Sequence, residues 1–253
     1  MSATTRIRFV LVGTQHPGNI GAAARALKTM GLARLVLVAP EKGVDEEAMR
    51  RAAGADDLLT QAPVYATLAE AVADCQLVLG CTARSRRVAL EELLPEVGAQ
   101  QVVEAAAGGL EVAVVFGRER TGLANDELEL CQRAIHIPSD PAFSSLNLGA
   151  AVQVLAYAVR VAVLAEQAAP AAEEPGVREG PATHDQVEGF YGQLAQTLDA
   201  IDFHKGRSPD SALRKLRRLF GKAELTEQEV RLLRGILADA QRMARLAADG
   251  TSD

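Results

Sequence analysis

Three separated segments of the sequence carry polar residues of the types that bind ligands and take part in catalysis. Asn19 and Arg25 lie in the first segment, Glu119 lies in the second, and Ser145 and Asn147 close the third. Amides, hydroxyls and carboxylates supply hydrogen bonds, while a guanidinium stays charged and pairs with phosphate. These residue types predict a polar ligand site, provided that the fold brings three distant parts of the chain together.

Each segment follows a short apolar run that stops at Gly or Pro. Ile7–Val12 is followed by Gly13, Val112–Phe116 is followed by Gly117, and a run at 135–137 stops at a proline. Runs of this kind are typical of buried strands that feed loops. Because open parallel sheets bind ligands at the carboxyl ends of their strands, we expect a site at that edge.

The pattern of the first 140 residues predicts an α/β fold. We expect strands at 7–12, 35–39, 57–65, 77–80 and 112–116, and between them helices at 20–30, 44–53, 67–73 and 99–107. Strands that alternate with helices are typical of a parallel sheet.

The remainder of the chain predicts a second, helical part. A helix at 146–167 is apolar nearly all round, and because Arg160 interrupts it we expect burial in a core or subunit interface rather than a membrane span. A segment rich in Pro, Ala, Glu and Gly follows, and then helices at about 184–200, 210–220 and 226–247. We therefore expect three parts: a domain at 1–167, a linker at 168–183 and a helical domain at 184–253.

Composition and charge narrow the class of protein. Three cysteines without a C-x-x-C spacing argue for a reducing compartment and against a disulfide framework or zinc site, and no metal-binding cluster is visible. The apolar start is too short for a signal peptide, so we expect a cytoplasmic protein. The net charge is −6, yet residues 1–40 hold five cations and no acid, and residues 203–222 hold seven cations and one acid. This segregation predicts a face that binds a polyanion, the alternative being two solvated basic helices.

Several motifs can be set aside, and some residues have a plainer alternative role. The glycines at 13, 18 and 21 do not fit G-x-G-x-x-G, and no G-K-[ST] is present, which argues against dinucleotide-binding and P-loop sites.

Asn19 and Asn147 could simply cap helices, and Glu119 could form an ion pair with Arg118 or Arg120. Arg25 lies among small residues, where packing poorly explains a long cation.

The motifs resemble those of a known enzyme family. N-I-G-A-A-A-R at 19–25, F-G-R-E-R-T-G-L at 116–123 and I-P-S-D-P-A-F-S-S-L-N-L-G-A-A-V at 137–152 resemble the signature motifs of the SpoU branch of the SPOUT RNA 2′-O-methyltransferases. C-T-A-R-S-R at 81–86, F-Y-G at 190–192, K-L-R-R-L-F at 215–220 and L-R-G-I-L at 233–237 are closer still to the TrmJ type, the tRNA (cytidine/uridine-32) 2′-O-methyltransferases. The resemblance covers nearly the whole chain.

The resemblance implies a fold and a cofactor. It implies a parallel-sheet SPOUT domain with a deep trefoil knot, made by the segment around 138–165, and a small all-helical C-terminal domain. It also implies S-adenosylmethionine bound by backbone groups of three loops, whose small residues let the main chain come close. The implied cofactor-binding residues are Cys81, Thr82, Ala83, Gly117, Ile137, Ser144, Ser145 and Leu146. Cys81 stands where relatives would have Thr or Ser.

The resemblance further implies roles in methyl transfer to a ribose 2′-hydroxyl. Arg25 would orient the hydroxyl and adjacent phosphate, with phosphate or water accepting the proton, and Asn19, Glu119, Ser145 and Asn147 would form a hydrogen-bond frame around it. Apart from the resemblance, His16 lies near the first motif and is an alternative general base, although a histidine in a loop more often has no catalytic role. Arg84, Arg86 and Arg87 directly follow the expected cofactor loop, so we expect them to bind RNA, the alternative being a solvated loop. The other expected RNA-binding residues are Arg118, Lys205, Arg214, Lys215, Arg217 and Arg218.

The implied partners are tRNA and a second copy of the chain. The homodimer would place the ligand site near the subunit interface, with the 146–167 helix contributing, and we expect no membrane, DNA or metal partner. Two alternatives remain open: a 2′-O-methyltransferase acting on another tRNA position or on rRNA, and a non-catalytic RNA-binding protein that kept the fold.

Overall fold

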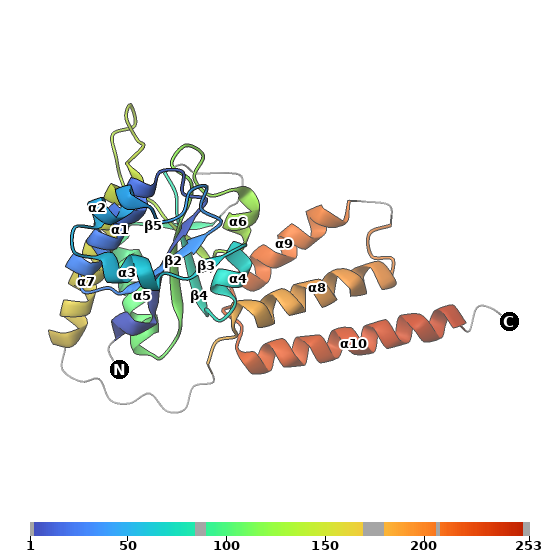
Figure 1. The fold of residues 1–253 in the computed structure, drawn as a ribbon. Coiled ribbons are helices and arrows are strands. Elements are labelled where there is room, and N and C mark those ends of the chain that lie inside the picture. Colours follow the sequence, from blue (N-terminus) through green and yellow to red (C-terminus); the bar gives the residue numbers. More distant parts are fainter. Residues whose placement is uncertain (1–2, 84–89, 169–179, 206–207, 250–253) are drawn as a thin grey trace. The chain divides into compact units, whose positions relative to one another are not determined.

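Seven strands form one parallel sheet in the first part of the chain (Figure 1). The structure is a computed structural model that describes residues 3–83, 90–168, 180–205 and 208–249. The sheet has the order β3-β2-β1-β6-β4-β7-β5, and each of its pairings is parallel. The strands are β1 (Ile7–Val12), β2 (Arg34–Val38), β3 (Val64–Tyr65), β4 (Leu77–Cys81), β5 (Glu91–Leu93), β6 (Val112–Phe116) and β7 (Arg133–Ile135). The predicted α/β class is confirmed.

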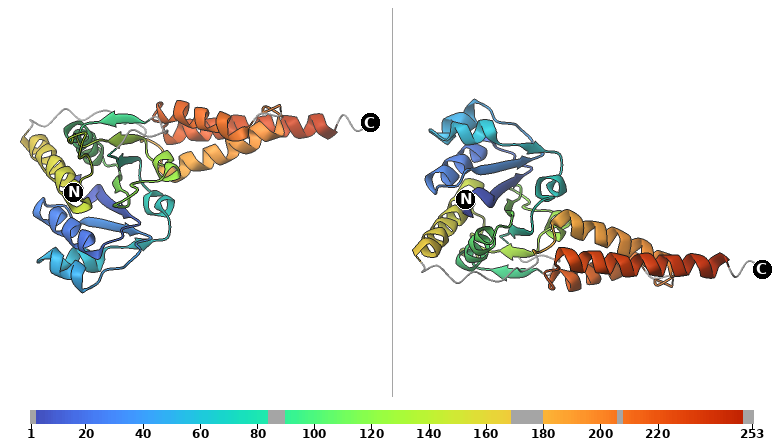
Figure 2. Two further views of the ribbon diagram at one scale, coloured as in Figure 1. Left: turned by 90° about the horizontal axis from the view of Figure 1, so that it is seen from above. Right: turned by 90° about the horizontal axis from the view of Figure 1, so that it is seen from below.

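Helices cover both faces of this sheet, as the two views of Figure 2 show. Strand residues alternate between the faces, so that Phe9 and Leu11 join one apolar cluster while Val10 and Val12 join another. The first cluster contains buried residues of α1 (Pro17–Thr29), α2 (Glu46–Ala52), α3 (Asp56–Gln61), α5 (Pro95–Ala107) and α7 (Leu148–Ala168). The second contains those of α4 (Leu68–Val72) and α6 (Asn125–Glu129). The sheet is therefore the middle of three layers.

The structure differs from the predicted elements at several places. The strand expected at 57–65 is wrong for most of its length, because Asp56 and Asp57 open the short helix α3 and only Val64 and Tyr65 form β3. Two helices begin earlier than predicted, since Pro17 and Pro95 occupy first-turn positions that suit proline. The strand β5 and the helix α6 were not predicted, being only three and five residues long.

The helix α7 packs closely on α1 and α5. At the start of α7, a Cβ on Gly149 would lie 2.8 Å from the Cβ of Ala22, so small residues allow this approach. Among the described residues α7 is the one helix long and apolar enough to cross a membrane by length and composition alone, a test that a buried core helix also passes. The threading of this part of the chain into a knot stays a prediction from the resemblance.

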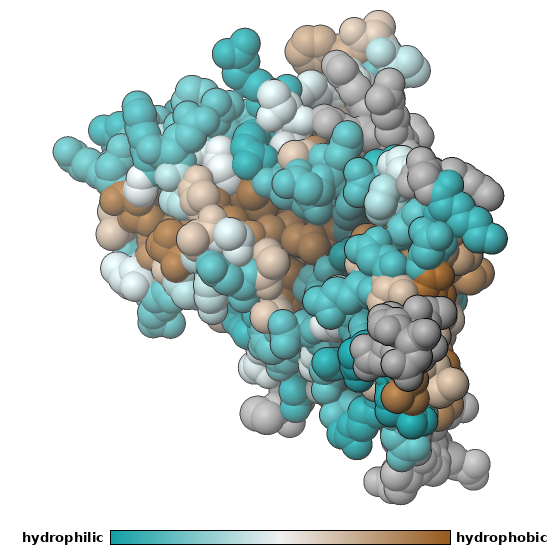
Figure 3. Space-filling view, turned by 90° about the vertical axis from the view of Figure 1, so that its right-hand side faces the viewer, coloured by the Kyte–Doolittle hydropathy of each residue, from teal (hydrophilic) through white to brown (hydrophobic). Residues whose placement is uncertain are grey.

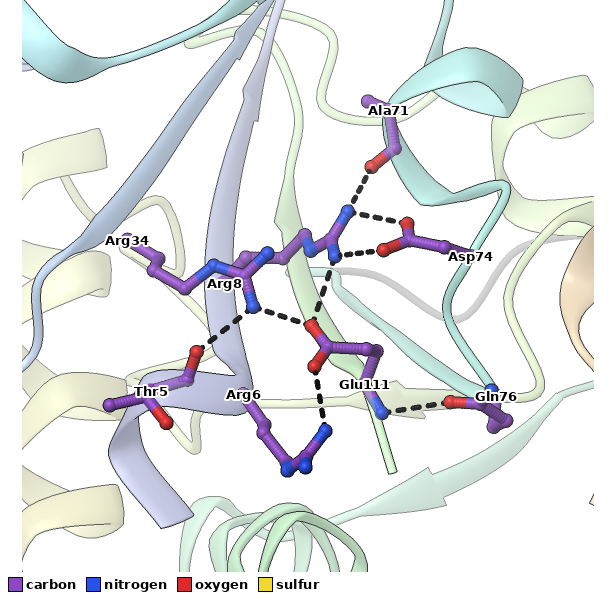
Figure 4. Close-up of polar contacts among 8 residues, drawn as sticks. All are labelled: Thr5, Arg6, Arg8, Arg34, Ala71, Asp74, Gln76 and Glu111. Atoms are coloured by element: carbon purple, nitrogen blue, oxygen red, sulfur yellow. Dashed lines mark hydrogen bonds and ion pairs between the residues drawn. The ribbon is translucent and has the colours of Figure 1, made fainter. Parts of the chain in front are cut away.

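At the amino ends of the strands, charged residues form a partly buried network (Figure 4). Arg8 is 4% exposed and donates two hydrogen bonds to Asp74, of 2.7 and 2.6 Å, and one of 3.1 Å to Glu111. Glu111 also accepts from Arg6 and Arg34. Burial alone would raise the pKa of Glu111, but the bonds and charges of Arg34 and Arg8 lower it. This network ties β1 and β2 to the turns before β4 and β6.

The second part of the chain is a three-helix unit. The chain divides into two compact units, Met1–Glu174 and Pro175–Asp253. The second unit contains α8 (His184–Ala200), α9 (Pro209–Gly221) and α10 (Glu227–Asp249). Phe190 packs edge-on against Phe220, with ring centroids 4.9 Å apart, in a small apolar core. A capping box opens α10, since the Glu229 amide donates to Thr226 Oγ1 and the Thr226 amide donates to the Glu229 carboxylate. The face drawn in Figure 3 is largely hydrophilic, with apolar side chains exposed in patches.

Candidate active site

The sheet brings the predicted loops to one edge. In the strand register Cys81 lies beside Phe116 on one side and beside Ile135 on the other, and Leu11 lies on the far side of Phe116. The chain therefore leaves four neighbouring strands, β1, β6, β4 and β7, at the same carboxyl edge. Each predicted polar segment starts or passes there, as expected for a ligand site in a parallel sheet.

The loop after β6 is a tight turn that projects Glu119. The Gly122 amide donates to the Arg118 carbonyl at 2.8 Å, and the Arg118 amide donates to the Gly122 carbonyl at 3.2 Å. The chain crosses itself so closely that a Cβ on Gly117 would lie 2.1 Å from the Gly122 carbonyl carbon. Only glycine fits at position 117, and Glu119 lies inside the turn that the Arg118–Gly122 bonds close.

Glu119 accepts three hydrogen bonds at the start of α1. The donors are the backbone amides of Gln15 at 2.9 Å and His16 at 3.2 Å, and the side-chain amide of Asn19 at 2.8 Å. Burial alone would raise the pKa of Glu119, but the bond from Asn19 and the backbone bonds outweigh it and lower that pKa. Glu119 is thus held as an anion near a helix N-terminus.

Asn19 continues this chain of bonds to the third segment. Asn147 Nδ2 donates to Asn19 Oδ1 at 3.0 Å, while Asn147 Oδ1 accepts from the Gly149 amide at 2.9 Å. Asn19 is not a cap, since α1 begins at Pro17 after the N-cap residue His16. Asn147 does bond the first amides of α7, so it serves both the helix and the site. Glu119, Asn19 and Asn147 form what we call the frame, a hydrogen-bonded chain across three segments.

Two predicted members of the site lie outside the frame. Ser145 and Arg25 are both exposed, and their side chains make no hydrogen bond or ion pair with any residue that the structure describes. The ion pair considered for Glu119 is absent within this same part of the chain, because Arg118 pairs with Glu127 and Arg120 has no described partner. The frame is therefore built without Arg25.

The first basic region does not form the polyanion-binding face that its charge predicted. Glu111, at the opposite edge of the sheet, forms ion pairs with Arg6, Arg8 and Arg34. Lys28 forms an ion pair with Asp57 at 2.7 Å. Of the five cations in residues 1–40, Arg25 alone lacks an acidic partner among the described residues. The sequence could not distinguish these cases, because the partners lie far along the chain.

The second basic region is more open. Three cations of α9 are exposed and have no acidic partner among the described residues: Arg214, Lys215 and Arg218. Lys205, which precedes the helix, is exposed too. Arg217 is different, since Glu188 binds it through two bonds of 2.6 and 2.7 Å and its guanidinium lies 4.4 Å from the centre of the Tyr191 ring. Arg217 therefore stabilises the helical unit. Arg84, Arg86 and Arg87 lie outside the described residues.

The predicted cofactor loops present main-chain groups at the carboxyl edge. The Thr82 amide donates to the Ile135 carbonyl at 3.0 Å, which fixes the end of β4 beside β7, and Ser139 Oγ donates to the Ser144 carbonyl at 3.0 Å. Within the described ranges, the main-chain groups of Ile137, Ser145 and Leu146 form no hydrogen bond and remain available for a ligand. Burial raises the pKa of the Cys81 thiol to about 12, so this side chain stays neutral.

Gln15 and Glu127 also belong to the site, although the sequence did not indicate them, and His16, which the sequence indicated only as a general base, joins it through its main chain. Gln15 and His16 contribute through backbone amides, which carry no residue-type signal. Glu127 contributes by binding Arg118, and its only sequence signal is its place in the acidic first turn of α6. No group of three or more His, Cys, Asp or Glu that could hold a metal occurs among the described residues.

Comparison with known proteins gives consistent matches along the chain. Residues 6–157 match the SpoU rRNA Methylase family, and residues 185–249 match the family of the tRNA methyltransferase TrmJ C-terminal domain. The sequence is 48% identical over 245 residues to the tRNA (cytidine/uridine/adenosine-2′-O-)-methyltransferase TrmJ of Pseudomonas aeruginosa, covering 95% of each chain. It is 48% identical over 236 residues to the tRNA (cytidine/uridine-2′-O-)-methyltransferase TrmJ of Salmonella typhimurium, covering 93% of this chain and 96% of the other.

The fold is similar to that of a solved relative. The crystal structure of TrmJ from Z. mobilis ZM4 superimposes with a TM-score of 0.78 at 36% sequence identity. The match covers 92% of this chain and 97% of that one, so it includes the sheet, the helices that flank it and the helical unit.

Proposed function

The chain belongs to the SpoU methylase family, in its TrmJ branch of tRNA 2′-O-methyltransferases, and we propose that it methylates the ribose of nucleotide 32 in the tRNA anticodon loop. The acceptor would be the 2′-hydroxyl of cytidine or uridine, and the donor S-adenosylmethionine. The observation that carries the proposal is the frame, which joins three segments over more than 100 residues of sequence at the edge where the cofactor loops lie.

The loops at this edge fit the donor molecule. An adenine ring needs main-chain donors and acceptors at close range, and those of Ile137, Ser145 and Leu146 are unused among the described residues. The turn at Gly117 and the segment Cys81, Thr82 and Ala83 would complete the cradle, and Ser144 would shape it. When bound, S-adenosylmethionine supplies an electrophilic methyl group.

Arg25 is the residue we assign to the ribose and its phosphate. Its guanidinium is exposed and unpaired within the described part of the chain, while the other cations of residues 1–40 are bonded to acids. A guanidinium does not serve as a base at neutral pH, so it would orient the acceptor and stabilise charge. The frame and Ser145 would position the acceptor, and water, phosphate or the exposed His16 would take the proton.

The helical unit would hold the body of the tRNA. Arg214, Lys215 and Arg218 are exposed on α9, and three unpaired cations on one short helix suit a phosphate backbone. Lys205, Arg84, Arg86 and Arg87 would add to this attraction.

We further propose that the protein acts as a cytoplasmic homodimer. Tyr157, Val161 and Leu164 are 59%, 47% and 48% exposed on one side of α7, and their spacing forms a stripe that a second copy could cover. The three cysteines are free thiols, in keeping with a reducing compartment. Sedimentation of the wild type and of Val161→Asp tests the dimer, which would be rejected if the wild type sediments as a monomer at micromolar concentration.

The proposed reaction is tested by methyl transfer from labelled S-adenosylmethionine to purified tRNA, followed by mass spectrometry of the product nucleotides. We expect one labelled nucleotide at position 32 and no transfer to a tRNA that already carries a 2′-O-methyl group there. Labelling at another tRNA position, or only in rRNA, would show that nucleotide 32 is not the substrate and would identify the nucleotide that is. Absence of transfer to any RNA, with the donor bound, would favour the non-catalytic alternative.

A further inference from the structure

We infer that Arg118 is a positioning residue that holds the Glu119 loop in place through Glu127, and that it does not bind RNA phosphate. The inference rests on the proposed function, because the loop concerned carries a member of the frame. It also changes the role predicted for Arg118, which was a contact with RNA.

The guanidinium of Arg118, whose side chain is 33% exposed, is paired with one carboxylate. Its Nη1 and Nη2 atoms donate to the two oxygens of Glu127 at 2.9 and 3.0 Å, which is the paired geometry that arginine forms with carboxylates. Glu127 is 13% exposed and accepts a further bond of 2.7 Å from the Ala124 amide at the start of α6. The bond to Glu127, before any other cause, raises the pKa of Arg118. Arg118 thus links the Glu119 loop to α6.

The same side chain covers the turn after β1. Gly13 has a φ of +59°, and a Cβ at that position would lie 2.6 Å from Arg118 Nε and 2.8 Å from Arg118 Cγ. Arg118 therefore lies directly on the Gly13 backbone, in space that any other residue at 13 would occupy. This contact fixes the start of the 13–19 turn relative to the loop after β6.

Arg118 and Glu119 together attach that loop to the 13–19 turn at two places. Arg118 contacts Gly13 at the start of the turn, and Glu119 accepts from Gln15, His16 and Asn19 toward its end. Because the two residues are adjacent in a turn closed by the Arg118–Gly122 bonds, movement of Arg118 would displace Glu119. A displacement of about 1 Å at a reaction centre can lower the rate about 100-fold.

Glu127 opposes a phosphate contact at Arg118. Two of the five N–H groups of the guanidinium face Glu127, so a phosphate could meet only the remaining ones, and the Glu127 charge beside them would repel it. Arg120, two residues away, is exposed and has no described partner, so it offers a matched control for a loop cation that is free to meet RNA.

The variants Arg118→Gln, Glu127→Gln, the double variant and Arg120→Gln distinguish the two roles in the full-length protein. Three quantities are measured: the single-turnover methylation rate at saturating tRNA, the tRNA dissociation constant at several salt concentrations, and the hydrogen-exchange protection of the Gln15 and His16 amides. Arg118→Lys is added because lysine keeps the charge and loses the forked geometry. Thermal melting establishes that each variant is folded.

For a positioning role, Arg118→Gln and Glu127→Gln each lower the rate about 10- to 100-fold, and the double variant is no slower than the worse single one. Both reduce protection of the two amides and leave the tRNA dissociation constant and its salt dependence unchanged. Arg118→Lys behaves like Arg118→Gln, and Arg120→Gln keeps the wild-type rate.

Other results would overturn the inference. A phosphate contact predicts that Arg118→Gln reduces the salt slope by about 0.7 to 0.9. Glu127→Gln, which frees a cation, would then tighten tRNA binding. Unchanged amide protection in both single variants would also reject the positioning role. If the wild type transfers no methyl group to tRNA, the proposed function fails, and the amide protection alone decides the role of Arg118.

Discussion

Replacing Glu119 with glutamine should weaken both the frame and the folded state. The carboxylate accepts from Gln15, His16 and Asn19, whereas a glutamine presents one acceptor oxygen and an NH₂ group that must face at least one of these donors. A hydrogen bond to a charged group contributes about 1.5–3 kcal/mol, and Glu119 is partly exposed, so we expect a loss of about 2 kcal/mol. For a chain of this size that corresponds to a fall in Tm of about 4–8 °C.

The assay is thermal unfolding of the full chain followed by circular dichroism, with Glu129→Gln as the control. Glu129 is an exposed residue of α6 without a described partner, so its substitution removes the same charge and no bond. Because the pKa of Glu119 is lowered in the folded state, its contribution to stability is present above about pH 4.3 and is lost as pH falls through the lowered pKa. An equal Tm for Glu119→Gln and the wild type at pH 7 would refute the account of the frame.

Three further substitutions test other parts of the structure. Arg25→Ala should lower the single-turnover rate about 100-fold and leave Tm unchanged, because the side chain has no described partner; weaker RNA binding with an intact rate would contradict its assigned role. Glu111→Ala leaves three arginines without their shared acceptor and should cost about 3 kcal/mol in urea unfolding, whereas a wild-type midpoint would show that the network in Figure 4 contributes little. The third test neutralises Arg214, Lys215 and Arg218 of α9 together, which should reduce the salt slope of tRNA binding by about 2 to 3. An unchanged slope would show that α9 does not contact the RNA.

The strands and long helices were predictable from local pattern. The run at Val112–Phe116 is fully buried and forms β6 with the expected bounds, because a continuous apolar run that stops at glycine has few other uses. The strand β5 was not predictable, since two of its three residues are exposed glutamates and it exists only by pairing with β7. Short elements of this kind depend on tertiary contacts rather than on their own residues.

The members of the candidate site were partly predictable, but their connections were not. Motif resemblance singled out Asn19, Glu119 and Asn147, yet nothing local indicates that Asn19 bonds both of the others, from 100 and 128 residues away. For the same reason, the charge of Arg8 was wrongly counted toward a polyanion-binding face. Its acceptors Asp74 and Glu111 lie 66 and 103 residues along the chain, so sequence alone could not show that it is paired.

The way Glu119 is bonded limits where the reaction's proton can go. One of its oxygens accepts from His16 and Asn19, the other accepts from Gln15, and its pKa is lowered. A carboxylate that accepts three hydrogen bonds from fixed donors is a poor proton acceptor, and taking up a proton would weaken the bonds that link the first two motifs. If a ribose hydroxyl reacts at this edge, as proposed, its proton would go to solvent or to the nucleic acid, and Glu119 would stay ionised throughout.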